Sequence, residues 1–352
     1  MLTLTAATDD DGRRLDRILR KVMRDLPLST IHRLLRQGLV LVNGEKAGAD
    51  RRVRAGEKIM VNNINSGFLS QKHKGAGEDA VSNNHPKKFS ANLRSNTVPT
   101  FGSLLREEKV TDLILFEGSG LLALNKPSGL AVHGMKNEHK ESLEDWVRSY
   151  LAPKMPPSLS FRSGPLHRLD KPSSGIIVFS TSLEGARMFS SLIRDHKIKK
   201  KYLALVEGPI KESAIWEDEL IRDSNKKKTF ISQDGEDSVT NVKTAITKVR
   251  PLAENPACTL ILAEIETGRT HQIRAQAASH GHPLLGDRKY GGHNFPGRNS
   301  PQEFSSLSFF LHAWRMESPE GNSLPGLIEA PLPGYFQKKI VELFGPDKNI
   351  LK

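Results

Sequence analysis

Apolar residues recur at helical spacing twice near the start of the chain. Residues 15–22 (LDRILRKV) carry an apolar stripe with basic residues off it, which predicts a first amphipathic helix. Residues 31–35 carry a second stripe, and we expect Ser29 to cap this helix and Gly38 to end it. Both helices would be short, with one buried face each.

Alternation replaces helical spacing after these two helices. Residues 39–42 and 57–61 predict strands, and the pair Asn43-Gly44 predicts a tight turn after the first of them. From about residue 110 to residue 344, short apolar runs broken by Gly and Pro alternate with a few helical patterns. Short strands with few long helices indicate an α+β fold in both regions.

The composition changes between these two regions. Residues 65–108 are rich in Ser, Asn, Gly and Lys and show almost no apolar periodicity. Such a segment cannot bury enough surface to offset the entropy lost on ordering, so we predict a flexible linker or insertion. The chain is therefore expected to contain a small domain at residues 11–64 and a large domain at residues 109–345.

Positive charge is concentrated in the small domain. The chain has a formal net charge of +12, and residues 11–64 hold 13 Lys or Arg against six acidic residues. A basic helical face of this kind favours RNA as a partner, with Arg17, Arg33 and Arg36 as candidate RNA-binding residues. The alternative is a solvated helical surface, although such a surface usually mixes both signs of charge.

Other features exclude several classes of protein. The longest apolar runs, such as residues 113–116, are far shorter than the roughly 20 residues that cross a bilayer, so we expect no membrane partner. The single cysteine, Cys258, excludes an internal disulfide and any multi-cysteine metal site. The first residues show no secretory or transit signal, and we therefore expect a cytoplasmic protein.

Candidate chemistry lies in two segments of the large domain. In GPLHRLDKPSSGIIVFS (residues 164–180), a loop with Asp170 precedes a β-branched run that predicts a buried strand. In IETGRTHQIRAQAA (residues 265–278), Arg269 and Arg274 flank a turn that leads from a strand into a helix. A lone loop aspartate more often shapes a turn or caps a helix. If the two segments pack together, however, a guanidinium would hold the Asp170 carboxylate ionised.

Residues 13–61 resemble the RNA-binding domain that is named after small-subunit ribosomal protein S-four. The resemblance rests on the RRLD start, the serine before the second helix and the segment RQGLVLVNG. It implies a domain that holds structured RNA through phosphate contacts and performs no chemistry itself.

The large domain resembles the RluA-type pseudouridine synthases. Its matching segments are, in order, NKPSGLAVH (residues 125–133), HRLDKPSSG (167–175), KKYLALVEG (200–208) and the pair GRTHQIR (268–274) and GHPLLGDRKYG (281–291). The central motif departs from the family pattern at Ser173, where the family has threonine. The resemblance covers residues 113–333 and implies a catalytic domain on a largely antiparallel, bent mixed sheet with the active cleft across its middle.

This resemblance implies an enzyme that breaks the N-glycosidic bond of a uridine in RNA, rotates the uracil and rejoins it through carbon 5. Asp170 is then the catalytic carboxylate, Arg168 enters the RNA where the target nucleotide is flipped out, and Tyr202 faces the uracil as a candidate for proton transfer. Arg274 is the favoured salt-bridge partner of Asp170, and Arg269 is the reserve choice and otherwise an RNA contact. Whether Asp170 attacks the ribose, attacks the base or assists removal of the 2′ proton stays open.

The expected chemistry needs no metal or organic cofactor. An aspartate with its ordinary pKa of about 3.9 is already ionised at neutral pH. His133, His167 and His271 are interpreted as core or hydrogen-bonding side chains, because no carboxylates accompany them at metal-ligand spacing. Lysines at residues 197–201 and 226–228 are expected to line the approach to the cleft, although the second run could equally be a solvated loop.

The expected substrate is large-subunit (23S) ribosomal RNA, because the small domain is most similar to that of the family branch that modifies this RNA. Transfer RNA is the second candidate, and we expect the chain to act as a monomer. Two other classes are a non-catalytic ribosome-assembly protein and a nucleoside hydrolase. The intact motif around Asp170 argues against the first, and a hydrolase would release free base, whereas isomerisation leaves the mass of the RNA unchanged.

Overall fold

The described residues fall into two compact units. The computed structural model describes residues 1–62, 111–134, 142–155, 158–223, 228–232, 242–293, 309–321, 323–346 and 350. The small unit lies within Met1–Arg106 and Ala152–Arg162, and the large unit lies within Glu107–Leu151 and Ser163–Lys352. The predicted linker at residues 65–108 lies outside the described residues.

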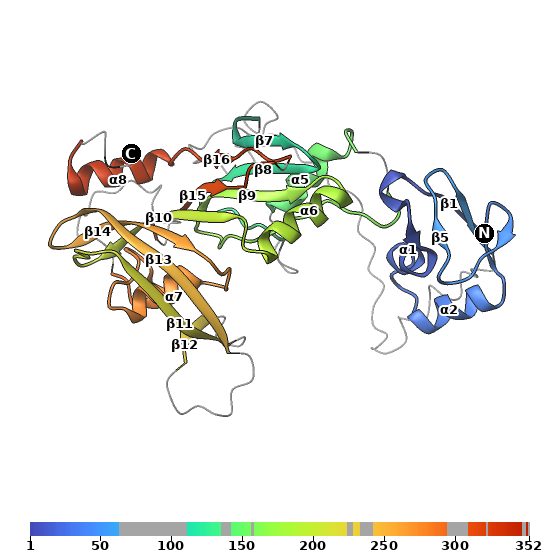
Figure 1. The fold of residues 1–352 in the computed structure, drawn as a ribbon, viewed down its shortest axis with the longest axis horizontal. Helices are drawn as coiled ribbons and strands as arrows, with labels where there is room; N and C mark the ends of the chain where they lie inside the picture. The colour runs from blue at the N-terminus through green and yellow to red at the C-terminus, as the bar shows by residue number, and fades with distance from the viewer. Residues whose placement is uncertain are drawn as a thin grey trace, which may run out of the picture. The chain divides into compact units, whose positions relative to one another are not determined.

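The small unit, blue in Figure 1, combines two helices with a four-stranded sheet in one hydrophobic core. Its elements are β1 (Leu2–Thr5), the 3-10 helix η1 (Thr8–Asp10), β2 (Arg13–Arg14), α1 (Leu15–Val22), α2 (Leu28–Arg36), β3 (Val40–Val42), β4 (Glu45–Lys46), β5 (Arg52–Val53) and β6 (Lys58–Val61). The sheet order is β1-β6-β3-β4, and β2 pairs with β5 separately. Both predicted apolar stripes are buried in this core, since Leu15, Ile18 and Leu19 of α1 and Ile31, Leu34 and Leu35 of α2 belong to it.

Local chemistry explains the turns of this unit and corrects one prediction. Asn43 and Gly44 have φ values of 52° and 88°, as a two-residue hairpin turn requires. Gly38, with a φ of 66°, follows α2 in the left-handed conformation that stops a helix. The prediction that Ser29 caps α2 is wrong, because α2 begins directly after Pro27 and no side-chain cap forms. Proline fixes a φ that leads into a helix, so Ser29 lies inside the first turn.

The large unit is built on one mixed sheet. Its strands are β7 (Ile114–Gly118), β8 (Leu121–Lys126), β9 (Ser174–Ser180), β10 (Lys199–Glu207), β11 (Ala214–Asp223), β12 (Lys228–Ile231), β13 (Lys243–Glu254), β14 (Cys258–Ile265), β15 (Leu311–Glu317) and β16 (Leu327–Glu329). Their order is β12-β11-β13-β14-β10-β15-β9-β8-β7, with β16 beside β15. Only the pairing of β15 with β9 is parallel among the described strands. The prediction of an α+β fold on a largely antiparallel mixed sheet is confirmed.

Helices lie against this sheet at several places. They are the 3-10 helix η3 (Thr111–Leu113), α5 (Leu143–Leu151), α6 (Leu183–Arg194), α7 (Gln272–Ser279), the 3-10 helix η4 (Arg288–Tyr290) and α8 (Gly334–Phe344). Figure 1 shows α7 against the part of the sheet formed by β11, β12 and β13, and α7 also contacts η4. Helix α8 buries Phe336 and Ile340 in a cluster with Leu203 and Leu205 of β10.

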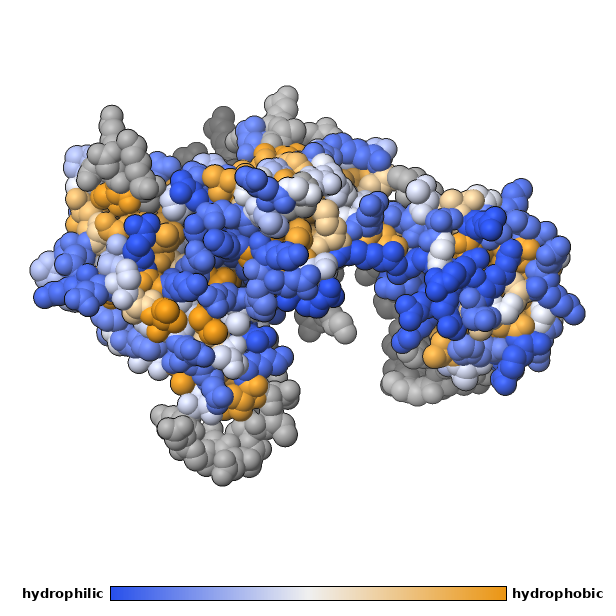
Figure 2. All heavy atoms as spheres, in the orientation of Figure 1, coloured by the Kyte–Doolittle hydropathy of each residue, from blue (hydrophilic) through white to orange (hydrophobic). Residues whose placement is uncertain are grey.

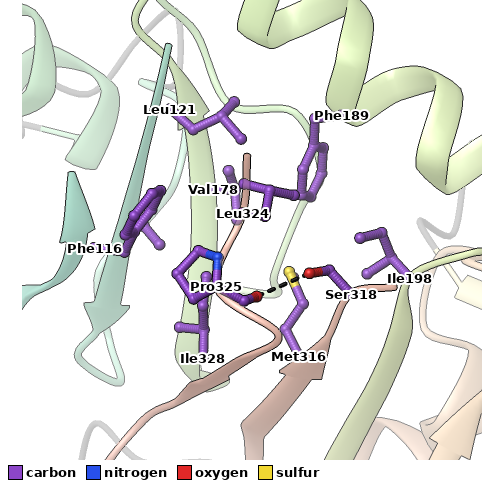
Figure 3. Close-up of a pocket in the computed structure, with 11 residues that line it drawn as sticks. Phe116, Leu121, Val178, Phe189, Ile198, Met316, Ser318, Leu324, Pro325 and Ile328 are labelled. Atoms are coloured by element: carbon purple, nitrogen blue, oxygen red, sulfur yellow. Dashed lines mark hydrogen bonds between the residues drawn. The ribbon is translucent and has the colours of Figure 1, made fainter. Parts of the chain in front are cut away.

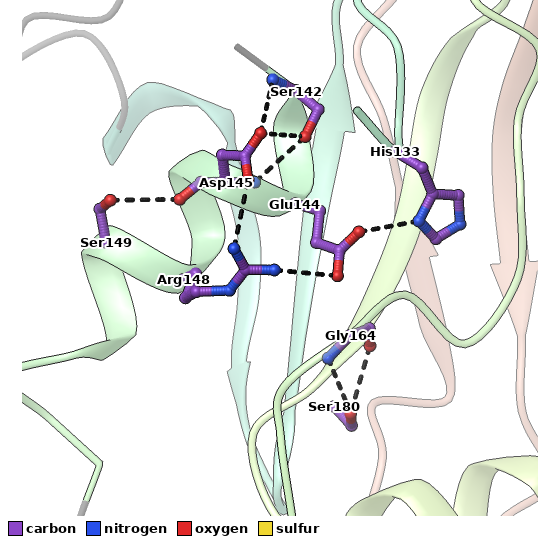
Figure 4. Close-up of polar contacts among 8 residues, drawn as sticks. All are labelled: His133, Ser142, Glu144, Asp145, Arg148, Ser149, Gly164 and Ser180. Carbon is purple, nitrogen blue, oxygen red and sulfur yellow. Dashed lines mark hydrogen bonds and ion pairs between the residues drawn. The ribbon is translucent and has the colours of Figure 1, made fainter. Parts of the chain in front are cut away.

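The start of α5 is stabilised by its own polar side chains (Figure 4). The Asp145 backbone N–H donates to Ser142 Oγ at 3.3 Å, and the Ser142 backbone N–H donates to Asp145 Oδ2 at 3.2 Å. Glu144 accepts from Arg148 Nη2 at 3.2 Å and pairs with His133 Nδ1 at 2.8 Å. The segment NKPSGLAVH, which ends at His133, is thereby held against this helix.

The middle of the sheet positions the loop that carries Asp170. Gly175 of β9 lies opposite Ala313 of β15, and Ala313 lies opposite Tyr202 of β10. Gly175 has a φ of 105°, and a Cβ atom there would lie 2.2 Å from the Ala313 carbonyl oxygen, so only glycine fits. Because Asp170 shortly precedes Gly175 in the chain, its loop opens at the centre of the sheet, in line with Tyr202.

Few large apolar side chains are exposed in the described part of the chain. They are Met1, Leu28, Ile215, Phe230, Leu327 and Val341. Figure 2 shows mostly hydrophilic residues on the visible face, with small apolar areas between them. None of the helices in the described ranges is long and apolar enough to cross a membrane.

An apolar pocket lies in the large unit, and its lining residues are uncharged (Figure 3). Its lining consists of Phe116, Leu121, Ala123, Val178, Phe189, Ile198, Met316, Ser318, Leu324, Pro325 and Ile328. The hydroxyl of Ser318 already donates to the Pro325 carbonyl at 2.8 Å. Since no lining side chain is charged, this pocket has no means of binding a phosphate or of performing acid-base chemistry.

Candidate active site

Asp170 and Arg274 form an ion pair. Asp170 Oδ2 accepts from Arg274 Nη1 at 2.7 Å. On the other side of the guanidinium, Asp287 accepts from Nε at 2.6 Å and from Nη2 at 2.9 Å. The Arg274 and Asp287 side chains are only 7% and 2% exposed, so two carboxylates hold this cation in a largely water-free place. The bidentate bond to Asp287 aims Nη1 at Asp170.

Helix α7 places Arg274 firmly because its first turn is tied to the neighbouring strand. Gln272 is buried, its Oε1 accepts from the Arg269 backbone N–H at 3.0 Å, and its Nε2 donates to the Ile246 carbonyl at 3.0 Å. Arg269 itself is exposed and donates from Nε to the Thr244 carbonyl at 3.0 Å. Of the two arginines that the sequence offered as partners of Asp170, the structure brings Arg274 to it and not Arg269.

Aromatic rings cover the faces of the Arg274 guanidinium. Its central carbon lies 4.3 Å from the ring centre of Phe309 and 4.9 Å from that of Tyr290. Asp287 and Tyr290 are not among the site residues that the sequence predicts. Both belong to the segment GHPLLGDRKYG, so the motif contained the signal, but their roles depend on contacts with α7.

Tyr202 is a buried residue that feels the charge of Asp170. Tyr202 is 8% exposed, and burial together with the charge of Asp170 raises the pKa of its phenol. The phenol is therefore protonated at neutral pH. The apolar side chains of Leu169 and Ile273 are buried as well, at 8% and 5% exposed. Arg168, in contrast, is exposed to solvent.

Lys126 is a buried lysine that was not among the site residues predicted from the sequence. Its side chain is fully buried, and Nζ donates to the carbonyls of Pro127 at 3.0 Å, Leu130 at 2.9 Å and Lys171 at 3.1 Å. Burial lowers the pKa of Lys126 to about 7, against the opposing charge of Asp170. Three carbonyls match the three N–H groups of an ammonium. Lys126 thereby ties the NKPSG segment to the residue that follows Asp170.

The histidines make separate hydrogen bonds. His167 Nε2 accepts from the Val178 backbone N–H at 3.1 Å, and burial lowers the pKa of His167 to about 3. His271 Nδ1 lies 2.8 Å from Tyr290 Oη, and His133 pairs with Glu144. Within the described ranges, no group of three or more His, Cys, Asp or Glu side chains is arranged to hold a metal ion.

The lysines that were expected along the approach to the cleft differ in their surroundings. Lys201 pairs with Glu317 and lies 3.9 Å from Glu264, so its charge is neutralised locally. Lys228 Nζ lies 4.9 Å from the ring centre of Tyr290 and thus beside the site. The other two lysines of the run 226–228 lie outside the described residues.

The candidate RNA-binding arginines of the small unit are solvent-exposed. Arg17 lies on α1, and Arg33 and Arg36 lie on α2, all on the outside of helices whose apolar stripes are buried. Their guanidinium groups are therefore accessible to a polyanion.

Comparison with known proteins relates both units to RNA modification. Residues 120–279 match the family described as RNA pseudouridylate synthase, and residues 13–59 match the S4 domain. The chain is 28% identical over 339 residues to ribosomal large subunit pseudouridine synthase C of Vibrio vulnificus, covering 95% of each chain. It is 29% identical over 336 residues to the protein of the same name from Escherichia coli K12, covering 92% of this chain and 91% of the relative.

A solved structure supports the same fold. Human RNA Pseudouridylate Synthase Domain Containing 4 superposes with a TM-score of 0.54 at 22% identity, covering 68% of this chain and 97% of that one. At this identity the likeness concerns the fold alone.

Proposed function

Because the chain belongs to the RNA pseudouridylate synthases, with an S4 domain at residues 13–59 before the synthase domain at residues 120–279, we propose that it isomerises uridines of large-subunit ribosomal RNA through Asp170. The choice of RNA follows the curated relatives, which are named for the large ribosomal subunit and match the chain over most of its length. The observation that best supports the role of Asp170 is its 2.7 Å hydrogen bond with the Arg274 guanidinium, which Asp287 binds on the opposite side.

The reaction moves one bond and one proton. The bond between uracil N1 and ribose C1′ breaks, the base turns, and C1′ joins C5. The proton that leaves C5 is matched by one that N1 gains, so the nucleotide keeps its mass. In this proposal Asp170 supplies the negative charge that acts on the flipped nucleotide, and Arg274 binds the carboxylate through a charge-assisted hydrogen bond. No step changes an oxidation state, so the proposal includes no cofactor.

The remaining roles follow from exposure and position. Tyr202, whose raised pKa keeps the phenol protonated, faces the uracil and takes part in proton transfer. Arg168 is exposed beside Asp170 and enters the RNA where the target nucleotide leaves the stack. Arg269 and the small-unit residues Arg17, Arg33 and Arg36 bind phosphates.

The test compares the wild-type chain with Asp170→Asn on unmodified transcripts of large-subunit ribosomal RNA and of transfer RNA. Pseudouridines are mapped by carbodiimide-induced stops of reverse transcription, and mass spectrometry follows the RNA. We expect Asp170→Asn to lose at least about 10³-fold in rate, as removal of an essential catalytic group does, while RNA affinity changes little. Asp195→Asn, at an exposed aspartate after α6, is the matched control and should keep the wild-type rate.

Each other outcome identifies a different function. Pseudouridine formed in transfer RNA alone would move the substrate to transfer RNA, and release of free uracil would indicate a hydrolase. No modification of either RNA by the wild-type chain would favour a non-catalytic ribosome-assembly protein. An Asp170→Asn variant that works at the wild-type rate would remove Asp170 from the mechanism.

The same proposal includes a monomer that acts in the cytoplasm. All side chains that it assigns to the chemistry come from one copy of the chain, so no second copy is needed to complete the site. Light scattering should then give a mass near the chain mass of 39.0 kDa, and a dimer mass at working concentrations would contradict it.

A further inference from the structure

His271 lies between Tyr290 and Asp170, at a place that the proposed mechanism does not yet use. It precedes α7 in the left-handed conformation, with a φ of 55°. Its Nδ1 lies 2.8 Å from Tyr290 Oη, and its Nε2 lies 3.6 Å from Asp170 Oδ1. Arg274 holds the other carboxylate oxygen, Oδ2. The two oxygens of Asp170 therefore face two different nitrogens.

The hydrogen bonds around Tyr290 favour one tautomer of the imidazole. The Thr229 backbone N–H, which can only donate, reaches Tyr290 Oη at 2.9 Å. With the Thr229 N–H already donating to this oxygen, we assign the hydroxyl proton of Tyr290 to His271 Nδ1, which places the proton of the imidazole on Nε2. The contact between His271 Nε2 and Asp170 is consistent with this tautomer, because a lone pair on Nε2 would repel the carboxylate, whereas an N–H is attracted to it.

The surroundings keep this imidazole neutral. Burial, together with the charges of Arg274, Arg222 and Lys289, lowers the pKa of His271 to about 4, although the charge of Asp170 acts in the opposite direction. At neutral pH His271 is thus a neutral N–H donor rather than a second cation beside Asp170. The Tyr290 ring meets the imidazole edge-on, with ring centres 5.7 Å apart, and so also limits its rotation.

We propose that His271 is a positioning residue for Asp170: its Nε2–H, directed by Tyr290, faces Oδ1 and holds the carboxylate in one orientation while the target nucleotide reacts. A closure of about 0.5–1 Å turns the 3.6 Å approach into a hydrogen bond. With Oδ2 bound to Arg274 and Oδ1 facing His271, rotation of the carboxylate is blocked. This inference rests on the proposed function.

A purely structural role for His271 makes a different prediction. Histidine and asparagine are both enriched in the left-handed conformation, so a residue needed only for this backbone would be replaced best by asparagine. A donor to Asp170 would be replaced best by glutamine, because the glutamine amide nitrogen reaches close to the place of Nε2, whereas that of asparagine reaches only the place of Nδ1. The two roles therefore rank His271→Gln and His271→Asn in opposite order.

The kinetic test measures single-turnover isomerisation at saturating RNA, together with RNA affinity. We expect His271→Asn to slow the reaction about 10–100-fold, as a misplaced catalytic group does, and His271→Gln to stay within about fivefold of the wild type. RNA affinity should be unchanged in both. An asparagine variant that is as fast as the glutamine variant, or faster, would overturn the proposal.

The chain offers a matched control for the backbone conformation. His196 is also left-handed, with a φ of 52°, and its Nδ1 bonds the Glu266 carbonyl at 3.0 Å. His196→Gln and His196→Asn carry the same conformational change without Asp170 nearby, so both should isomerise RNA at the wild-type rate. A slow His196→Gln variant would show that the backbone conformation sets the rate, and the proposal would then be wrong.

A measurement without turnover separates this inference from the proposed function. Long-range proton–nitrogen NMR of the histidine rings in the free, full-length chain should show His271 protonated on Nε2, and Tyr290→Phe should populate the other tautomer. If the wild-type chain modifies neither ribosomal nor transfer RNA, the proposed function fails, yet the spectrum still decides whether His271 presents an N–H to Asp170. A proton on Nδ1 in the wild-type chain would overturn the proposal.

Discussion

At the residue scale, the site depends on how one guanidinium is shared between two carboxylates. Asp287 takes two N–H groups of Arg274, from Nε and Nη2, and leaves Nη1 for Asp170. Because Asp287 and Arg274 are both buried, neither charge can be hydrated if the other is lost. Asp287 therefore stabilises the fold and orients the site at once.

Replacement of Asp287 by asparagine should show both effects. Removing Asp287 leaves the buried Arg274 charge compensated only in part, by Asp170, so we expect Asp287→Asn to lower the free energy of unfolding by about 3 kcal/mol. Urea denaturation measures this loss, and single-turnover kinetics should show slower isomerisation. The exposed Asp195→Asn should change the stability by less than about 0.5 kcal/mol. Equal stabilities of the two variants would contradict the assigned role of Asp287.

At the element scale, helices α1 and α2 separate two kinds of surface. Their apolar stripes share the core of the small unit, and Arg17, Arg33 and Arg36 are exposed. A helix keeps these two sets apart because residues three or four positions apart share a face. The exposed arginines can therefore be changed without disturbing the core, which makes the RNA-binding prediction testable.

Joint replacement of Arg17, Arg33 and Arg36 by glutamine should weaken RNA binding in a salt-dependent way. The slope of log affinity against log salt is negative, and each lost phosphate contact reduces its magnitude by about 0.7–0.9. The magnitude should therefore decrease by about two to three in the triple variant. Filter binding at several salt concentrations measures it. Arg194→Gln, at an exposed arginine of α6, is the control. An unchanged slope in the triple variant would mean that these arginines do not contact phosphates.

At the scale of the whole molecule, residues distant in sequence complete the small unit. Asp10 is fully buried and accepts from Ser158 Oγ at 3.0 Å and from the backbone N–H groups of Leu159 and Ser160 at 2.9 Å each. Although burial opposes ionisation, these hydrogen bonds lower the pKa of Asp10 overall. Leu159 also packs against the core of this unit. A segment that shortly precedes the Asp170 loop in the chain is thus part of the small unit.

Replacement of Asp10 by alanine should release this segment. We expect the Leu159 and Ser160 amides to exchange about 10–100-fold faster in Asp10→Ala, since each lost hydrogen bond to a charged group is worth about 1.5–3 kcal/mol. Hydrogen-exchange mass spectrometry of the full chain measures the effect. Asp25→Ala, at an exposed aspartate of the same unit, should leave these amides protected. Unchanged exchange in Asp10→Ala would show that the carboxylate does not hold the segment.

Histidines whose pKa is lowered by the folded structure should make the large unit sensitive to acid. Burial lowers the pKa of His167 to about 3, of His271 to about 4 and of His312 to about 4, from an ordinary value of 6.5. As the pH falls from 6.5 toward 4, the unfolded chain binds protons that the folded chain does not. The contribution of these neutral histidines to the free energy of unfolding is therefore complete above pH 6.5 and is lost progressively below it.

Between pH 7 and pH 5 we therefore expect the free energy of unfolding of the large unit to fall by about 1–2 kcal/mol for each of these histidines. Urea denaturation at the two pH values measures the change. His312→Gln should reduce the pH dependence, and His196→Gln, at an exposed histidine, should not. Equal stability at both pH values would contradict the neutral state of these side chains.

The amino-acid sequence by itself determined the features that depend on neighbours in the chain. The spacing of apolar residues predicted α1, α2 and the buried strand β9, because a helix or strand face is set by residues a few positions apart. Motif order likewise brought Asp170, Tyr202 and Arg274 together as candidates. Ser29 was misjudged because the fixed φ of Pro27 competes locally with a cap.

Only the tertiary structure decided which of these residues meet. Asp170 and Arg274 are 104 positions apart in the chain. The sheet register and the buried helix α7 place Arg274, and not Arg269, within hydrogen-bonding distance of Asp170. The same packing brings Asp287 behind Arg274 and Tyr290 onto His271. Such contacts form between elements that the chain order leaves unpaired, so their geometry follows from long-range packing and cannot be read from local spacing.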